Sequence, residues 1–357
     1  MAAPSLLTPT SYAELLERCA NAAFGEAFPH DGAFISKIVR GRRYWYFQLP
    51  SEKGRAQKYV GPETPELMER IERYKDVRDD ERERRALVSA LIRSFGLPRP
   101  VAEIGAVLEA LALSGVFRLR GVLVGTIAYQ CYSAMLGTKL PASILQTGDI
   151  DIAQFKTVSV AVKDHTQPMF DVLKAVDKTF RAVPHGSDRR RVTSYAAKGG
   201  LRVDFLTPNE GRDTVVPQAL PALQTDAQPL RFLDYLIRNP EPAAVLYNAG
   251  IYVLVPSPER YAIHKLIVTH RRPSGTAKRD KDLKQAESLL RVLAEKRPHE
   301  LEAAWNEAHG RGASWRKSLL ESLLQLEAVP RDLLLKTIGW ARSNVAGLKL
   351  TFSEEPP

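Results

Sequence analysis

Short apolar segments in the middle of the chain alternate with turns and predict a small sheet. The run Gly121-Val122-Leu123-Val124 ends in Gly125-Thr126 and passes into a segment of small and apolar residues typical of an amphipathic helix. A second short strand is expected at Asp149-Ile150-Asp151, and a third in the alternating stretch 201–206, which contains Asp204. The pattern predicts strands and helices together, as in an α+β fold.

The remainder of the chain predicts helices around this sheet and one strand-rich region near the N-terminus. We expect a helix at 10–27, strands at 34–60 and a long charged helix at 62–95. After the core, a surface linker rich in Pro, Gln and Asp is expected at 207–230 and a helical bundle at 299–346. We therefore expect an N-terminal part (1–98), a core (99–207), and a linker with a C-terminal helical domain (208–357).

Aromatic and basic residues interleave in the N-terminal strands. Tyr44 and Trp45 point to opposite faces of a strand, beside Arg42 and Arg43, and Lys58 lies on a later strand. Aromatic side chains stack on bases and basic ones hold phosphates, so one interpretation is a nucleic-acid-binding hairpin or three-stranded meander. The alternative is a half-buried sheet whose outer face is only basic and solvated, because strands are naturally rich in aromatic residues.

Asp149 and Asp151 are expected to share one face of their strand, because positions i and i+2 point the same way. Such a pair can bind divalent cations, and the alternative is an exposed strand end with solvated acids. Asp204, on another strand, can face the same place. The Gly125-Thr126 turn stands where a strand passes into a helix, and the N–H groups of a helix N-terminus can hold a phosphate.

With these residues in place, the chain resembles the nucleotidyltransferase superfamily with the polymerase-beta-like fold. The hallmark of that superfamily is a Gly-Gly or Gly-Ser turn, a helix, an Asp-x-Asp or Asp-x-Glu strand and a later single acid. The resemblance covers about residues 100–290. Within the superfamily, the chain looks like a bacterial family akin to the abortive-infection toxins, in which a basic helical segment follows the catalytic domain, as in His264-Lys265-Leu266 and Lys278-Arg279-Asp280-Lys281-Asp282-Leu283.

The resemblance implies a nucleotidyltransferase core at 99–207, built as a small mixed sheet with flanking helices. This core is expected to use a nucleoside triphosphate and two Mg²⁺ ions. It implies catalytic and metal-binding roles for the three acids, Asp149, Asp151 and Asp204. It implies nucleotide-binding roles for the turn residues Gly125 and Thr126 and for Lys265, in the helix after residue 258. Lys265 lies near an otherwise apolar helix face, where it either extends from the packed side to solvent or contacts a triphosphate. The resemblance favours the triphosphate.

Two departures from the superfamily pattern stand in the sequence. Thr126 replaces the usual Gly or Ser, which keeps a hydroxyl and adds a methyl group. The interval from Gly125 to Asp149 is longer than the usual helix needs, so we expect an inserted loop over 137–148. Neither departure removes a metal ligand.

Charge and composition limit the classes of binding partner and the cellular compartment that we expect. The 51 Lys and Arg exceed the 41 Asp and Glu, and the formal charge of +10 favours a polyanionic partner, either a nucleoside triphosphate or nucleic acid. The sequence contains no apolar run long enough to span a membrane, and its two cysteines agree with a reducing compartment, so we expect a cytoplasmic protein. Zinc-binding, P-loop and Gly-x-Ser-x-Gly hydrolase motifs are absent.

Three functions from different classes remain open. The first is an enzyme that transfers a nucleoside monophosphate to RNA, most plausibly to tRNA ends, which the basic aromatic strands and the net charge favour. The second is an enzyme that nucleotidylates a protein, as the toxin of a toxin-antitoxin or phage-defence pair, with an antitoxin as partner. The third is an inactive nucleic-acid-binding module. The intact acids argue against the third and do not separate the first two.

Overall fold

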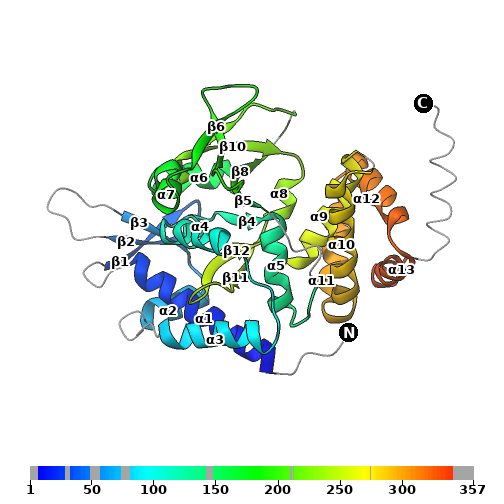
Figure 1. Cartoon of the computed structure of the whole chain (residues 1–357), viewed down its shortest axis with the longest axis horizontal. Helices are drawn as coiled ribbons and strands as arrows, with labels where there is room; N and C mark the ends of the chain where they lie inside the picture. Colours follow the sequence, from blue (N-terminus) through cyan, green and yellow to red (C-terminus); the bar gives the residue numbers. More distant parts are fainter. Residues whose placement is uncertain are drawn as a thin grey trace.

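The computed structural model describes residues 7–28, 33–48, 57–73, 81–141, 148–209, 211, 213–273 and 275–340. It confirms an α+β fold with a mixed central sheet, N-terminal helix and strands, and a C-terminal helical region, which occupies the right-hand side of Figure 1. None of the described helices is long and apolar enough to cross a membrane.

The central sheet has seven strands, and β8 is at its centre. Its main path runs β4-β5-β8-β10-β9, formed by Val122–Val124, Asp149–Ala153, Arg202–Pro208, Thr225–Leu230 and Gln218–Leu220. An antiparallel hairpin of β6 (Arg181–Pro184) and β7 (Val192–Ala196) joins β8 through β7. The β5–β8 pair is parallel, whereas β4 runs antiparallel to β5, so the sheet is mixed as expected.

The segment expected to be a surface linker, 207–230, instead supplies β9 and β10. The interpretation was wrong because polar composition concealed a short buried pattern, in which Leu220, Ala222, Leu223 and Ala227 are buried. Pro229 is tolerated because the residues paired with β9 end at Ala227, so its position has a strand neighbour only on the β8 side. The sheet therefore continues beyond residue 207, and the domain boundaries at 98 and 207 stay predictions.

The N-terminal strands form an antiparallel meander, β1-β2-β3, made by Ala33–Val39, Arg42–Gln48 and Gln57–Pro62. The predicted tip at 51–54 lies outside the described residues. A partly buried ion pair joins the meander to the core. Arg118 contacts Asp164 at 2.5 Å and donates to the Tyr59 carbonyl at 2.7 Å, and Asp164 accepts from the Tyr59 N–H at 2.9 Å.

Helices surround the sheets. Helix α1 spans Leu7–Ala27, and the region expected as one charged helix gives α2 (Pro65–Arg73) and α3 (Glu81–Arg93), while residues 74–80 lie outside the described part. The core adds α4 (Ala102–Leu113), α5 (Gly125–Met135), α6 (Lys156–Ala161), α7 (Met169–Val176) and α8 (Leu233–Leu236). The predicted loop at 137–148 is described only at its two ends.

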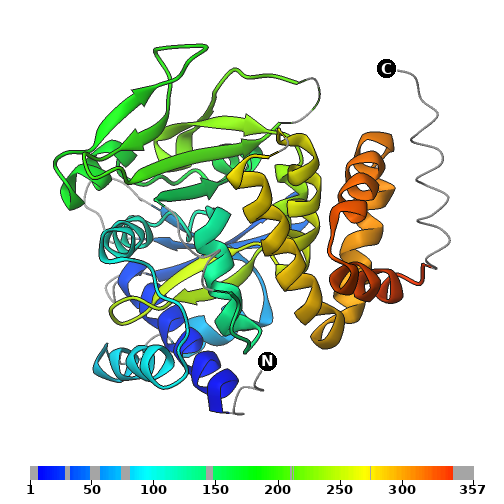
Figure 2. The same ribbon diagram turned by 45° about the vertical axis from the view of Figure 1, so that its right-hand side comes forward.

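The C-terminal region begins with the hairpin β11–β12 (Glu241–Val245 and Ile251–Val255) and continues as helices α9 to α13. These helices span Pro258–Arg271, Ala277–Lys296, Pro298–Gly310, Ala313–Gln325 and Ala328–Thr337, and Figure 2 shows α11 to α13 outside α9 and α10. Ser257 caps α9 by accepting from the Arg260 N–H, with Pro258 in the first turn. One cluster of buried side chains extends from Tyr59 to Ile338 and joins this region to the sheet.

Candidate active site

The site begins where β4 ends and α5 starts. Gly125 opens α5 with a φ of +68°, a conformation that favours glycine. A Cβ added at Gly125 would lie 2.2 Å from Asp151 Oδ2, so the backbone comes too close to that carboxylate for any side chain. Gly125 and Thr126 are the first residues of the helix, whose leading N–H groups have no partner within it. The turn therefore has the geometry of an anion-binding element and lies directly beside an acid.

The three acids predicted from the sequence lie on one face of neighbouring strands. Strands β5 and β8 run parallel, with Asp151 opposite Asp204 and Asp149 opposite Arg202. Paired strands lie about 4.8 Å apart and opposite residues point to the same side. Val124, the residue before the turn, is opposite Asp151 on its other side. The expected adjacency of Asp204 to the 149/151 pair is confirmed, whereas the roles of the three acids stay predictions.

Asp204 is held in place through one of its two oxygens. Arg202 Nε donates to Asp204 Oδ1 at 2.8 Å, the Ser194 hydroxyl donates to the same Oδ1, and Arg202 Nη2 donates to Ser194 Oγ at 2.8 Å. Among the described residues, Oδ2 has no hydrogen-bond partner. The carboxylate is thus oriented while one oxygen stays available for a ligand.

Asp151 experiences an unfavourable electrostatic environment. Burial, followed by repulsion from Asp204 and Asp149, raises its pKa to about 6, and the nearby cations Lys265 and Lys278 oppose this rise. Carboxylates gathered in this way favour the binding of positive charge. Lys278, at the start of α10, lies close enough to Asp151 for its charge to lower the pKa of that carboxyl.

Lys265 lies in a buried ion cluster at the α9–α10 contact. Its Nζ is 2.5 Å from Asp282 Oδ1, and Arg272 Nε is 2.7 Å from Asp282 Oδ2. The Asp282 side chain is only 6% exposed, and that of Lys265 is 12% exposed. The lysine is therefore not extended into solvent. It is held by a counter-ion, and it is near enough to Asp151 to lower that residue's pKa.

Tyr261 connects α9 to the Gly125-Thr126 turn. Its hydroxyl lies 3.0 Å from the Gly125 carbonyl oxygen and 3.0 Å from Gln285 Oε1 on α10. Nearby, the Tyr129 hydroxyl of α5 is 2.7 Å from Ser288 Oγ of α10. The C-terminal helices therefore position the turn, although they lie more than a hundred residues from it in the sequence.

The arrangement fits magnesium and a triphosphate. Carboxylate oxygens are the ligands that Mg²⁺ prefers, and it is usually held by one or two carboxylates together with substrate phosphates. Among the described residues, no three acidic, histidine or cysteine side chains already converge into a closed set of ligands. A site of this type is completed by the phosphates of the substrate, and the open Asp204 Oδ2 agrees with that chemistry.

The predicted nucleic-acid-binding residues lie in the separate β1–β3 meander. Arg42 and Arg43 are exposed, while Tyr44, Trp45 and Lys58 are half-buried. The Tyr44 and Tyr59 rings are 6.5 Å apart, and Tyr44 packs against the main core. Trp45 Nε1 donates to Glu63 at 3.0 Å, and Arg43 lies 3.7 Å from the same carboxylate. Their aromatic surface is partly used in packing, and nucleic-acid binding by this sheet stays a prediction.

Four residues of the site were not identified from the sequence: Ser194, Arg202, Tyr261 in its bonding role, and Asp282. Arg202 has a recognisable signal, because it lies two residues before Asp204 in an alternating strand and must share its face. Ser194 and Asp282 have no such signal, since their contacts depend on strand register and on helix packing.

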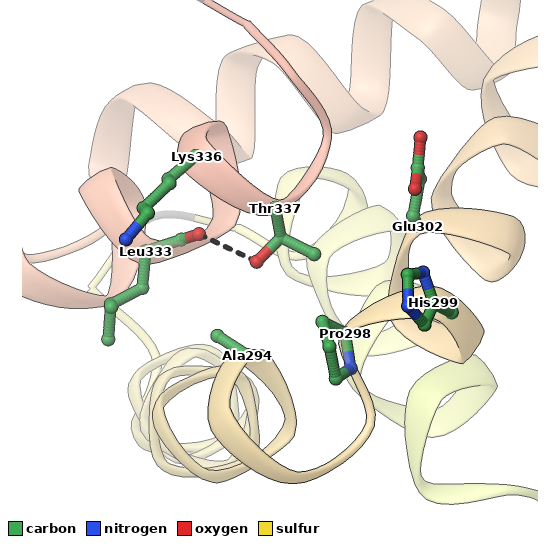
Figure 3. Close-up of a pocket in the computed structure, with 7 residues that line it drawn as sticks. All are labelled: Ala294, Pro298, His299, Glu302, Leu333, Lys336 and Thr337. Carbon is green, nitrogen blue, oxygen red and sulfur yellow. Dashed lines mark hydrogen bonds between the residues drawn. The ribbon is translucent and has the colours of Figure 1, made fainter.

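A pocket of about 300 Å³ lies elsewhere, between α10, α11 and α13 (Figure 3). The labelled side chains include Glu302, Lys336 and His299, and Thr337 donates to the Leu333 carbonyl at 2.9 Å within α13. It shares no residue with the acids or with the turn.

Comparison with known proteins assigns the chain to a family. The chain matches the Nucleotidyltransferase family over residues 102–310, which is more than half of its length and includes the turn, the acids and α9–α10. No curated protein matches the chain. Among solved structures, an antigenic nucleotidyltransferase-like protein from Paracoccidioides brasiliensis matches at 14% identity and a TM-score of 0.31, covering 62% of this chain and 94% of its own. On the strength of the family match, the chain belongs to the Nucleotidyltransferase family.

Proposed function

We propose that the protein is a metal-dependent nucleotidyltransferase that moves a nucleoside monophosphate from a nucleoside triphosphate to a hydroxyl group of RNA. The observation that carries the proposal is the register of β5 and β8, in which Asp151 lies opposite Asp204 on the face reached by the Gly125 turn. The same surface combines acids for a metal with N–H groups for phosphates.

Each residue has a role in this proposal. Asp149, Asp151 and Asp204 hold two Mg²⁺ ions, which when bound polarise the phosphate and stabilise negative charge on the attacking and leaving oxygens. The N–H groups at Gly125 and Thr126 bind the β and γ phosphates. Lys265 and Lys278, whose charges act on Asp151, offset the charge of the triphosphate.

The transfer forms one bond and breaks one bond. The acceptor hydroxyl oxygen attacks the α-phosphorus, and the bond from that phosphorus to the bridging oxygen of the β-phosphate breaks, so pyrophosphate leaves. The hydroxyl proton passes to solvent, and Asp204 assists its loss through the ion that its Oδ2, the oxygen without a partner among the described residues, would hold. Arg202 and Ser194 keep the carboxylate turned so that this oxygen faces the site.

The test uses each of the four α-labelled nucleoside triphosphates with total cellular RNA and with cell lysate, in the presence of magnesium. We expect the label to travel with RNA and pyrophosphate to be released. Asp149→Asn and Asp151→Asn should each abolish labelling while thermal unfolding stays cooperative.

Two outcomes would contradict the proposal. Undiminished labelling in both aspartate variants would remove the acids from catalysis. Label that travels only with protein would establish a protein acceptor, as expected for a protein-modifying toxin, and would exclude RNA. A matched control is Asp171→Asn, which removes one exposed carboxylate in the first turn of α7 and should leave labelling unchanged.

A further inference from the structure

Basic residues are concentrated around the β6–β7 hairpin, the part of the molecule that projects at the top of Figure 1. Between residues 174 and 202 the chain has eight Lys or Arg against two Asp, so this segment holds a large part of the +10 formal charge. We call four exposed cations of this region the basic hairpin face: Lys178, Arg181, Lys198 and Arg202.

Strand register aligns this face with the acids. Arg181 is opposite Ala196, Ala196 is opposite Arg202, and Arg202 is opposite Asp149. Directly opposite residues point to the same side of a sheet, so Arg181 and Arg202 lie on the side that carries the acids. At about 4.8 Å for each strand, Arg181 stands roughly 14 Å from Asp149. Ala196 is too small to close the space between the two arginines.

The cations of the face are largely without counter-ions. Arg202 contacts Asp204 at 2.8 Å, but Lys178, Arg181 and Lys198 form no ion pair within the described part of the chain. The Lys198 N–H donates to Thr179 Oγ1 at 3.0 Å, which joins the β7–β8 turn to the loop before β6. This bond brings the segment of Lys178 to that of Lys198. The arrangement concentrates positive charge beside Asp204, on the side of the acids away from the Gly125 turn.

The chemistry of the face favours a phosphate backbone. Protein partners are usually anchored by buried aromatic or aliphatic side chains, and the large aromatic of the hairpin, Tyr195, is itself buried against Phe205 and Phe170. Exposed cations that lack counter-ions bind phosphates without reading base sequence.

We infer that the basic hairpin face holds the phosphate backbone of the acceptor strand, with Arg181 and Lys198 contacting phosphates upstream of the hydroxyl that lies at Asp204. The inference rests on the proposed function and assigns its acceptor subsite. The triphosphate occupies the side of the Gly125 turn, and the acceptor arrives from the opposite side, across β7 and β6.

The experiment measures binding of a short fluorescent RNA with a free 3′ hydroxyl as salt is raised. The double variant Arg181→Ala/Lys198→Ala is compared with Arg316→Ala/Lys317→Ala, which removes two exposed cations from α12 on the far side of the molecule. Loss of two phosphate contacts should weaken binding at least tenfold near 0.1 M salt and reduce the salt slope by about 1.4 for a single strand. The α12 variant should bind like the wild type.

Catalytic measurements separate the acceptor subsite from the nucleotide subsite. The hairpin variant should raise KM for RNA and leave KM for the nucleoside triphosphate unchanged. A DNA strand of the same sequence is the second arm, because its backbone carries the same charge. The hairpin variant should lose binding of DNA as it loses binding of RNA, and a loss confined to RNA overturns the assignment of this face to backbone phosphates.

Failure of the inference and failure of the proposed function give different results. If the wild type labels RNA but the hairpin and α12 variants bind RNA equally, the inference is overturned and the transferase proposal stands. If no transfer is found, the binding comparison still decides the inference, because it needs no catalysis. Label found only on protein overturns both.

Discussion

Gly125 occupies a position where no side chain fits. Its φ is positive, and the space where a Cβ would stand is taken by an oxygen of Asp151. A glycine here lets the backbone of the turn approach the acid closely, and the phosphates of the proposed substrate would lie at the same place. Two causes therefore restrict this position to glycine: the lack of space for a Cβ and the positive φ.

Gly125→Ala should therefore reduce kcat/KM by about 100-fold, because displacing a reacting group by roughly 1 Å has an effect of that size. The strained φ should also lower the free energy of unfolding by on the order of 1–3 kcal/mol. Steady-state kinetics and urea unfolding measure the two effects. Gly310→Ala is the control, since nothing lies within 4 Å of a Cβ at that position. Full activity in Gly125→Ala would show that the close approach has no catalytic importance.

His264 gives the protein a defined response to acid. Burial and the adjacent Lys265 lower its pKa to about 3, whereas an unfolded histidine titrates near 6.5. Between these pH values the unfolded state binds a proton at His264 and the folded state does not. The neutral histidine therefore contributes fully to the free energy of unfolding above pH 6.5, and this contribution is lost as the pH falls. By pH 5 the loss should reach up to about 2 kcal/mol.

Unfolding free energies of His264→Gln and wild type, measured between pH 8 and pH 5, test this response. The variant should show the shallower decline over that interval. His299→Gln, which changes an exposed histidine of α11, should follow the wild-type curve. Equal declines in His264→Gln and wild type would contradict the role of burial.

The side chains of the site could be predicted from the sequence where one strand or one turn determines them. Asp149 and Asp151 share a face because of the two-residue period, and Gly125 follows an apolar strand. Lys265 was placed near the site by resemblance, but its pairing with Asp282 depends on how two helices pack. A sequence period describes one element and does not describe the contact between two.

At the scale of elements, Tyr261 links α9 to the first residue of α5. Tyr261→Phe removes one hydroxyl and should cost about 1 kcal/mol of stability, as is usual for a buried hydrogen bond. It should also raise KM for the triphosphate roughly fivefold, because the released Gly125 carbonyl no longer fixes the turn. Thermal unfolding and nucleotide kinetics measure the two effects.

Tyr235→Phe is the matched control for this link. The Tyr235 hydroxyl donates to the Ala304 carbonyl at 2.9 Å, is equally buried, and has no contact with the turn. It should lose similar stability and keep the wild-type KM. If both variants change KM equally, Tyr261 acts on stability alone.

The β1–β3 meander provides a second test at this scale. Arg42→Ala combined with Trp45→Ala should weaken RNA binding and reduce the salt slope by about 0.7 to 0.9 if this sheet contacts a phosphate. Trp315→Ala with Arg316→Ala on α12 is matched in residue types. RNA titrations at several salt concentrations measure the effect. Unchanged binding in the meander variant would leave these residues with a packing role, to which the Trp45–Glu63 hydrogen bond already points.

Elements with a clear period were predicted and elements with mixed composition were not. The amphipathic α1 and the apolar β4 lie where expected. Strands β9 and β10 were missed because they are short, polar in part, and stabilised by pairing with other strands, β10 with β8 and β9 with β10. The stability of a short strand depends on the strand that pairs with it, and a local stretch of sequence does not identify that partner.

For the molecule as a whole, function and stability are opposed at the acids. The ionised form of Asp151 is disfavoured by burial and by two neighbouring carboxylates. Asp151→Asn should therefore raise the free energy of unfolding of the metal-free protein at pH 8 by on the order of 1–3 kcal/mol while abolishing transfer. Unfolding in the presence of a chelator measures this difference. Glu17→Gln, on the exposed side of α1, should change stability little. A destabilised Asp151→Asn would show that the acid is well compensated without a metal.

The pairing of β10 with the far half of β8 decides where the chain can be divided. A fragment ending near residue 207 would keep every acid of the site, yet it would lose β10 and the buried side chains of α9 and α10. Its uncovered strand edge would recruit other copies and precipitate. A soluble piece must therefore extend at least through α10, so the proposed transfer cannot be studied on the acidic strands alone.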